Sequence, residues 1–485
     1  MGTAACLARA ALWALAAGAP LLAAGGPGEP AEGISASSFG AVADGVADDT
    51  VAIENALRAA AGAAPGARRL HLPAGTYRYS RNIRVDGVQV FGDGEDRTLL
   101  EAADGGRSAW VLTGDHPSVK DLSIRFSRTP TGRNPRNSAV GVEADLASGF
   151  SILRVRVGPV NSAGIMIRRS GGAPGAPAEI RDCTVEGTLA DGIHMTSLSH
   201  DIEVEGNHVR HTGDDFIAVV SYRADGGLCR DILIRDNVVA DQSNGRGITV
   251  VGGERVTIEH NSIRRSSGAG VYLASEAGYD TYGDADIAVL GNELSEVTTN
   301  ASQRHGAILL VGRTNPALLG PPLSVDGVRI EGNRVDGSTR SGIHIGAYSS
   351  HVLIVGNRIR NVRDCGISIY PKASDISVGT GAPGEAPNVI SDCGEHGVEV
   401  DPAGSGGVLL IRGVRFAGLN SQGRGHVDAI SIGPNSGFSR ISCTGNRLDQ
   451  EAGPRLTRMV ESLSPGAEAA GNTSDVGIGD FISPR

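Results

Sequence analysis

The chain is poor in aromatic residues, in clustered basic residues and in long apolar runs, and each shortage excludes a class of protein. Aromatic residues make up 4% of the 485 residues, whereas Gly occurs 70 times. This balance favours short strands and tight turns over a helical bundle. No run of Lys and Arg forms a stripe or tail, and the formal net charge is −10. Nucleic acid is therefore not an expected partner. The content of glycine and aromatic residues predicts an all-β protein.

Cysteine is also scarce and does not predict a disulfide framework. Of the 6 cysteines, Cys6 lies in the apolar N-terminal segment, which leaves an odd number in the rest of the chain. An odd number cannot form a complete set of pairs. Cys365 and Cys393 occupy neighbouring repeats and could stack or pair. Buried free thiols fit better, because Cys packs well as a small apolar residue.

The chain has one extended apolar run, at its N-terminus. Arg9 precedes an Ala- and Leu-rich segment that ends near Ala24, and the sequence "GGPGEPAEG" follows over residues 25–33. This pattern is typical of a signal peptide over residues 1–24 and a short linker, and it predicts a secreted protein. No later segment approaches the roughly 20 apolar residues of a transmembrane helix, so we expect no integral membrane segment.

One phrase recurs between residues 145 and 446. It begins with a strand rich in β-branched residues, followed by Gly-Asn or Asp-Asn and an apolar residue. A polar turn then leads to Gly-Ile or Gly-Val at the start of another strand. Examples are "DIEVEGNHV", "DILIRDNVV" and "HVLIVGNRI". The recurring asparagines are Asn207, Asn237, Asn261, Asn292, Asn333 and Asn357. A unit of about 24 residues with variable loop insertions is typical of a solenoid.

The repeat predicts a single-stranded right-handed parallel β-helix over residues 81–449. A single coil cannot bury its apolar face, so coils must stack. An Asn at a fixed turn tolerates left-handed geometry and can hydrogen-bond its counterpart in the next coil. Propeller blades also repeat, but they are longer and usually rich in aromatic residues, which argues against a propeller.

The start of the mature chain predicts a cap for this solenoid. In residues 34–80, Asp48 and Asp49 are N-cap candidates for an amphipathic helix that would plug the open end of the core. The sequence "FGAVADGVADDTVAIENAL…LHLPAGTY" resembles the N-terminal signature of the pectate-lyase-like superfamily of right-handed β-helices, which includes glycoside hydrolase family 28. Residues 450–485 are interpreted as a C-terminal cap and tail. The resemblance implies a monomer or homotrimer.

Three aspartates stand at the start of two successive strands. "LADGIHM" places Asp191 just before a strand, and "TGDDFIA" places Asp215 in the equivalent position with Asp214 beside it. Adjacent residues of an ideal strand face opposite sides, but a bend before the strand would let both aspartates face solvent. Because stacked coils are about 4.8 Å apart, we expect the three carboxylates to converge on one outer surface.

This cluster has the composition that glycoside hydrolysis requires. Carboxylates a few ångströms apart push one pKa upward, which can supply a protonated acid next to an ionised base. The pair of motifs resembles the "NTDG…GDD" core of family 28 polygalacturonases and of the related dextranases and α-1,3-glucanases. The resemblance implies that Asp214 is the general acid. It also implies that Asp191 and Asp215 hold and activate water, with inversion and without a metal or cofactor.

The chain departs from family 28 in the next two coils. Family 28 continues with "GHG" and "RIK", whereas this chain has "GRGITV" and "GAGVYLA". Arg246 therefore replaces the histidine, and Tyr272 and Ala274 replace the arginine and lysine that grip a galacturonate carboxylate. Polygalacturonic acid is consequently a poor candidate substrate. Arg246 is interpreted either as a ligand for an acidic or hydroxylated sugar or as a surface arginine in a stacked turn.

Tyrosines and outward-facing polar residues extend the predicted site. Six of the eight tyrosines lie on or just after this series of strands, namely Tyr222, Tyr272, Tyr279, Tyr282, Tyr348 and Tyr370. Aromatic rings pack on the C–H faces of sugars, and Tyr272 lies directly beside the acids. We therefore predict Arg246, Tyr272, His194 and Tyr222 as substrate-binding residues. His344 and Glu399 also point outward, and insertions near 274–286 and 311–325 would shape the site.

These observations favour a secreted glycosidase that cleaves a neutral or weakly acidic polysaccharide by metal-free, inverting hydrolysis. A polysaccharide lyase or epimerase on the same fold is the second hypothesis. It requires a basic proton acceptor, usually with Ca²⁺ or cationic side chains that neutralise a uronate. The third hypothesis is a non-catalytic carbohydrate-binding β-helix with a degenerate site.

Overall fold

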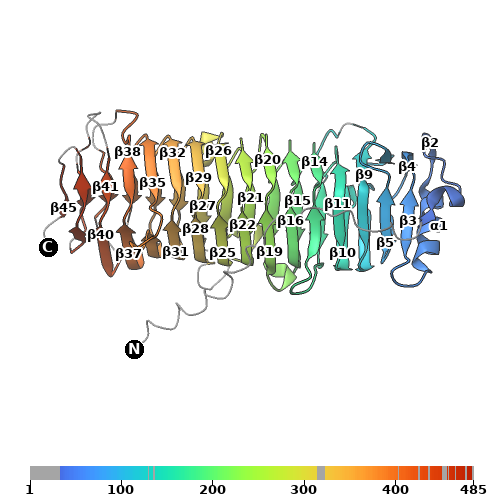
Figure 1. The fold of residues 1–485 in the computed structure, drawn as a ribbon, viewed down its shortest axis with the longest axis horizontal. Helices are drawn as coiled ribbons and strands as arrows, with labels where there is room; N and C mark the ends of the chain where they lie inside the picture. The colour runs from blue at the N-terminus through green and yellow to red at the C-terminus, as the bar shows by residue number, and fades with distance from the viewer. Residues whose placement is uncertain are drawn as a thin grey trace. The chain divides into compact units, whose positions relative to one another are not determined.

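Successive parallel coils form the described part of the chain. The computed structural model describes residues 33–482 except 129, 135–136, 314–322, 402, 424–426, 435–436, 450–455, 457, 465 and 476–477. The expected signal peptide, nearly all of the expected linker and part of the expected C-terminal tail lie outside these residues. Figure 1 shows the coils following one another from α1 at the blue end to β45 at the red end.

One sheet of 15 strands forms one side of the coils and carries the candidate site. Its strands are β5 (Ile83–Asp86), β8 (Trp110–Asp115), β10 (Val142–Ser148), β12 (Ile165–Arg168), β15 (Ile193–Thr196), β18 (Ile217–Val220), β21 (Ile248–Val251), β24 (Val271–Ala274), β27 (Ile308–Val311), β30 (Ile343–Ile345), β33 (Ile367–Ile369), β36 (Val398–Val400), β39 (Ile430–Ile432), β42 (Val460–Ser462) and β45 (Phe481–Ile482).

The other strands form a 30-stranded sheet. They are β1 (Ile34–Ser35), β2 (Asp44–Asp48), β3 (Arg69–Leu72), β4 (Gly75–Tyr79), β6 (Gln89–Gly92), β7 (Thr98–Ala102), β9 (Ser118–Phe126), β11 (Ser151–Val157), β13 (Ala178–Arg181), β14 (Thr184–Glu186), β16 (His200–Glu205), β17 (His208–Arg210), β19 (Cys229–Arg235), β20 (Val238–Ala240), β22 (Gly253–Glu259), β23 (Ser262–Arg264), β25 (Asp284–Leu290), β26 (Glu293–Val297), β28 (Val325–Glu331), β29 (Arg334–Ser338), β31 (Ser349–Val355), β32 (Arg358–Val362), β34 (Ser374–Val378), β35 (Val389–Cys393), β37 (Gly406–Arg412), β38 (Arg415–Ala417), β40 (Arg440–Thr444), β41 (Arg447–Leu448), β43 (Glu468–Ala470) and β44 (Thr473–Ser474).

Short 3₁₀ turns interrupt the loops between strands. They are η1 (Ala36–Phe39), η2 (Asn137–Ala139), η3 (Arg223–Asp225), η4 (Ala277–Tyr279) and η5 (Ala301–Gln303). None of the helices among the described residues is long and apolar enough to cross a membrane.

Stacked β-branched residues fill the interior of the coils. Ile193 pairs with Ile217, which pairs with Ile248, so that each inward position repeats from coil to coil. All three side chains are fully buried, as expected for β-branched residues on a pleated surface. The predicted all-β parallel β-helix is confirmed. The five cysteines among the described residues are buried free thiols, so Cys365 and Cys393 are not bonded.

The predicted asparagine ladder is present at one corner of the coils. The Asn207 Nδ2 donates to Asn237 Oδ1 at 2.9 Å, and Asn237 Nδ2 donates to Asn261 Oδ1 at the same distance. The ladder then continues through Asn292, Asn333, Asn357 and Asn388. The expectation that the asparagines adopt left-handed geometry is wrong. The residue before each adopts it instead, as in Gly206 (φ 66°) and Asp236 (φ 55°). This leaves the asparagine free to turn inward.

The predicted N-terminal helix is α1 (Thr50–Ala61), which buries Ile53, Ala56, Leu57 and Ala60 and contacts β1, β3 and β5. It therefore covers the end of the core. Asp49 stands at the N-cap but makes no side-chain capping bond. Its carboxylate instead accepts the backbone N–H groups of Val42 and Ala43, at 2.7 and 3.1 Å.

The ladder yields a prediction for stability. In Asn261→Ala, the backbone N–H and the Nδ2 of Asn237 lose the acceptor that they share, and Ile234 O and Asn292 Oδ1 lose a donor. Buried polar groups without partners are costly, so we expect the free energy of unfolding to fall by about 2–4 kcal/mol. Thermal and denaturant unfolding would measure the change. The exposed control Gln89→Ala should alter stability by less than about 0.5 kcal/mol, and equal effects of the two substitutions would contradict the prediction.

Candidate functional site

A bend before β18 and the parallel register bring the three predicted aspartates together. Ile193 pairs with Ile217, so Asp191 and Asp215 hold equivalent positions in adjacent coils. The Asp215 backbone N–H donates to Asp191 Oδ1 at 2.9 Å. One carboxylate oxygen from each of Asp191, Asp214 and Asp215 lies within 4.8 Å of the others. The predicted convergence of the three carboxylates is confirmed.

The aspartates line a pocket of about 670 Å³. Asp214 is the most accessible of them, with 27% of its side chain exposed, against 11% for Asp191 and 3% for Asp215. The expectation that both adjacent aspartates face solvent is therefore wrong for Asp215. The reason is Arg246, whose side chain lies over that carboxylate.

Arg246 is held by acidic side chains through each of its guanidinium nitrogens. Its Nε and Nη2 donate to the two oxygens of Asp215 at 2.8 and 2.9 Å, and its Nη1 donates to Glu276 Oε1 at 2.6 Å. The backbone N–H of Arg246 also donates to Asp215, at 2.7 Å. A bidentate pair of this kind is strong and fixes geometry. Arg246 lines the pocket and also fixes the position of the Asp215 carboxylate, so its role as a sugar ligand stays a prediction.

The Tyr272 ring packs against the guanidinium group of Arg246. Tyr272 is 2% exposed, and the Arg246 guanidinium lies 4.5 Å from its ring centroid. It is not among the residues that line the pocket. The prediction that Tyr272 is the foremost sugar-binding residue is therefore corrected, because the substituted Arg246 covers its ring. Tyr222 and His194, the other predicted binding residues, do line the pocket.

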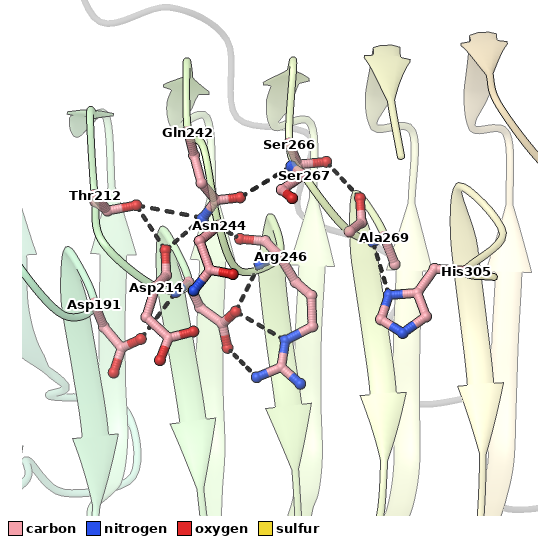
Figure 2. A network of polar contacts seen from close by, with 12 residues as sticks. Asp191, Thr212, Asp214, Gln242, Asn244, Arg246, Ser266, Ser267, Ala269 and His305 are labelled. Atoms are coloured by element: carbon pink, nitrogen blue, oxygen red, sulfur yellow. Dashed lines mark hydrogen bonds and ion pairs between the residues drawn. The ribbon is translucent and has the colours of Figure 1, made fainter. Parts of the chain in front are cut away.

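Each of the other two aspartates also has a charged or polar partner. The Nδ1 of His194 lies 2.7 Å from Asp191 Oδ2, and Arg133 Nη1 donates to Asp214 Oδ2 at 2.8 Å. The side-chain amide of Gln242 holds the backbone, because it donates to the carbonyl oxygens of Asp214 and of Arg246 (Figure 2). The bend that carries the acids is thus fixed from the neighbouring coil.

The surroundings push the pKa values of two neighbouring aspartates in opposite directions. Burial raises the pKa of Asp215, the charge of Arg246 offsets part of the rise, and the carboxylates of Asp191 and Asp214 add to it. Burial also acts to raise the pKa of Asp191, but the hydrogen bond and charge of His194, with Arg133 and Arg246, lower it overall. The ionised form of Asp191 is thus stabilised, whereas burial opposes the ionised form of Asp215 although Arg246 pairs with it.

His305 adds a neutral donor to the pocket. Burial and the charges of Arg246 and Arg313 lower its pKa to about 4, so the ring is neutral near pH 7. Its Nδ1 accepts the Ala269 backbone N–H at 3.3 Å (Figure 2). The hydrogen of the neutral ring is therefore on Nε2, which can donate to a sugar hydroxyl.

Several pocket residues were not predicted from the sequence. Glu276 belongs to the insertion at 274–286 that was expected to shape the site, as does Tyr279, which was among the tyrosines noted in the sequence. His305, Gln303 and Gln242 had no recognisable motif. Arg133 had no signal either, because it precedes Asp214 by 81 residues.

The three clustered carboxylates also have the composition of a cation site. A guanidinium or an imidazole nitrogen already contacts each of them, at 2.8 Å for Arg246–Asp215, 2.8 Å for Arg133–Asp214 and 2.7 Å for His194–Asp191. A cation would have to displace or oppose these groups. The donor set therefore fits ion-paired acids better than it fits a divalent metal.

Comparisons with known proteins agree on the fold and divide on the chemistry. The family described as rhamnogalacturonase A/epimerase, pectate lyase-like, matches residues 33–272. The mannuronan C5-epimerase AlgE1 of Azotobacter vinelandii is 34% identical over 119 residues, which are 21% of this chain and 8% of the epimerase. The chain thus matches less than a tenth of the length of this curated relative.

Two solved structures have a similar backbone. The catalytic unit of the thermostable GH87 α-1,3-glucanase of Streptomyces thermodiastaticus strain HF3-3 has a TM-score of 0.54 and 18% identity, over 92% of this chain and 69% of the glucanase chain. The A-module of the A. vinelandii mannuronan C-5 epimerase AlgE4 has a TM-score of 0.50 and 20% identity, over 71% of this chain and 97% of the module. At these identities the likeness establishes the fold alone.

The lowered pKa of Asp191 predicts how the stability depends on pH. A carboxyl group whose pKa is lowered by folding stabilises the protein above its ordinary value of about 3.9, and this contribution is lost as the pH falls through the folded value. The Asp191→Asn substitution removes the carboxylate charge and with it this contribution to the pH dependence of stability. We therefore expect the melting temperature of wild type to exceed that of Asp191→Asn, with the largest difference near pH 7. This difference should become smaller below about pH 4.

Thermal unfolding of both proteins between pH 3 and pH 7 would measure this gap. The control Asp104→Asn, at an exposed carboxylate, should show a small difference from wild type throughout. A gap for Asp191→Asn that widens towards acid pH would contradict the assignment of a lowered pKa.

Proposed function

We propose that this chain, whose residues 33–272 match the pectate lyase-like family, is a glycoside hydrolase that acts on a polysaccharide. The observation that carries this proposal is the cluster of Asp191, Asp214 and Asp215, whose oxygens lie within 4.8 Å of one another in a pocket. Membership of glycoside hydrolase family 28 itself stays a prediction from the motifs.

The three aspartates differ in ways that suit different roles. Asp214 has the most exposed side chain, at 27%, so it is the group that can reach a glycosidic oxygen as the general acid. Asp191 has a lowered pKa and is therefore ionised near neutral pH, as a base that activates water must be. Asp215, fixed by Arg246, holds the same water from the adjacent coil.

The stereochemical outcome is part of the proposal. Inversion is implied by the resemblance to family 28, in which water attacks while the acid protonates the leaving oxygen. Carboxyl groups of inverting enzymes are usually about 6.5–9.5 Å apart, and those of retaining enzymes about 5–5.5 Å apart. The oxygens here lie within 4.8 Å, so inversion requires that water be bound beside Asp191 and Asp215 and not between an opposed pair.

The charges of the pocket favour a neutral sugar. The lining includes the carboxylates of Asp191, Asp214, Asp215 and Glu276 and the guanidinium groups of Arg133 and Arg246. Both guanidinium groups are already paired with these acids. A uronate would therefore add a carboxylate to a lining whose two guanidinium groups are already paired with acids. The predicted signal peptide supports action on a polysaccharide outside the cytoplasm.

A uronate epimerase or lyase is the second candidate. The similarity to mannuronan C5-epimerase sequence and the pairing of His194 with Asp191 at 2.7 Å favour it, because an oriented histidine can abstract a proton next to a carboxylate. Arg133 and Arg246 are already paired with Asp214 and Asp215, which argues against a uronate substrate for this pocket.

Separate Asp214→Asn and Asp215→Asn variants test the hydrolase proposal. Wild type should release new reducing ends from at least one member of a panel of neutral glucans, arabinans and pectins. Loss of the general acid should lower kcat by about 10²–10⁴-fold in Asp214→Asn. NMR of the first anomer released distinguishes inversion from retention. The control Asp241→Asn, at a carboxylate paired with Arg265 outside this pocket, should retain activity.

The same panel discriminates between the candidates. A lyase would produce unsaturated ends that absorb ultraviolet light, and an epimerase would change the uronate composition without new reducing ends. Either result, or binding without any reaction, would refute hydrolysis.

A further inference from the structure

Arg133 reaches the acids from a distant part of the chain. It lies between β9 and β10, yet its Nη1 donates to Asp214 Oδ2 at 2.8 Å, three coils further along the solenoid. The backbone beside it is anchored, because the Asn134 N–H donates to Asn161 O at 2.7 Å. Among the described residues, Arg133 is the one before Asp191 that lines the pocket.

The pKa of Arg133 reflects the acidic groups around it. Burial acts to lower the pKa of Arg133, but the bond and charge of Asp214, with Asp191 and the Tyr279 phenol, raise it overall. Asp214 precedes the start of β18, whereas Tyr279 follows the end of β24. The connection that carries Arg133 leads into β10, so Arg133 reaches Asp214 from the side of the N-terminal coils.

Beyond the pocket, the outward face of the same sheet carries a row of largely buried side chains, followed by an exposed tyrosine. Tyr272, Leu309 and His344 hold equivalent outward positions on β24, β27 and β30. His344 stacks on Tyr370 with 4.4 Å between ring centroids and an interplanar angle of 13°. Tyr370 is 46% exposed, so the pair offers a flat face to a sugar ring. From the coil of Asp215 to that of Tyr370, five steps along the sheet span about 24 Å.

We propose that Arg133 closes the pocket towards the N-terminal coils, so that a glycan extends from the acids only towards the C-terminal coils. Cleavage then removes short units from a chain end. The terminal sugar lies against Arg133, and the His344–Tyr370 pair binds the chain further along. This inference rests on the proposed hydrolase function. It adds the direction in which the bound glycan runs along the coils and a specificity for chain ends.

The product pattern of the full chain tests this specificity. With a soluble neutral polysaccharide that it cleaves, wild type should release mono- or short oligosaccharides from the start while viscosity falls slowly. Arg133→Ala should produce a several-fold larger loss of viscosity for each reducing end formed, because the chain can then pass through. Arg128→Ala changes an exposed arginine of the same connection that makes no ion pair with a described residue, and it should match wild type.

A second variant tests the distal pair without touching the acids. Tyr370→Ala should raise KM several-fold for oligosaccharides long enough to reach β33 and leave KM unchanged for the shortest substrates that are cleaved. Random internal fragments from wild type at early times, or equal effects of Tyr370→Ala at all chain lengths, would overturn the inference. Failure of wild type to cleave any polysaccharide would instead refute the proposed function.

Discussion

The in-register parallel stacking of coils is the constraint on which the rest of this structure depends. Each coil repeats the inward apolar positions of the one before, so Ile193, Ile217 and Ile248 lie in a column. The asparagine ladder satisfies buried amide groups at the corner and fixes the same register. Because the coils are held in register, side chains that are 24 residues apart, such as Asp191 and Asp215, become neighbours.

Placing charged groups so close together is energetically unfavourable, and each of the three carboxylates is paired with a basic side chain. A buried carboxylate without a partner destabilises a protein by several kcal/mol, roughly 3–5 when one member of a pair is removed. Arg246 occupies both oxygens of Asp215 and also binds Glu276. Arg133 and His194 contact the other two acids. The ion pairs therefore stabilise the cluster and also determine which carboxylate is open to a substrate.

The similarities to both glucanases and epimerases follow from this architecture. The stacked strands supply a stiff surface on which a few side chains at the strand starts determine the chemistry, and folds of this kind carry several activities. In this chain both guanidinium groups of the described pocket lining are paired with acids, Asp214 is the most accessible of the three aspartates, and Asp191 has a lowered pKa.

The sequence by itself determined the solenoid, its asparagine ladder, its N-terminal helix and the meeting of the three aspartates, because all of these follow from local periodicity and fixed coil spacing. Only the tertiary structure decided how the site is surrounded. Arg133, Gln242 and His305 come from connections whose paths no periodicity specifies. The burial of Tyr272 beneath Arg246, and of Asp215 beneath the same guanidinium, depends on side-chain directions that are set by neighbouring coils and not by the residues' own spacing.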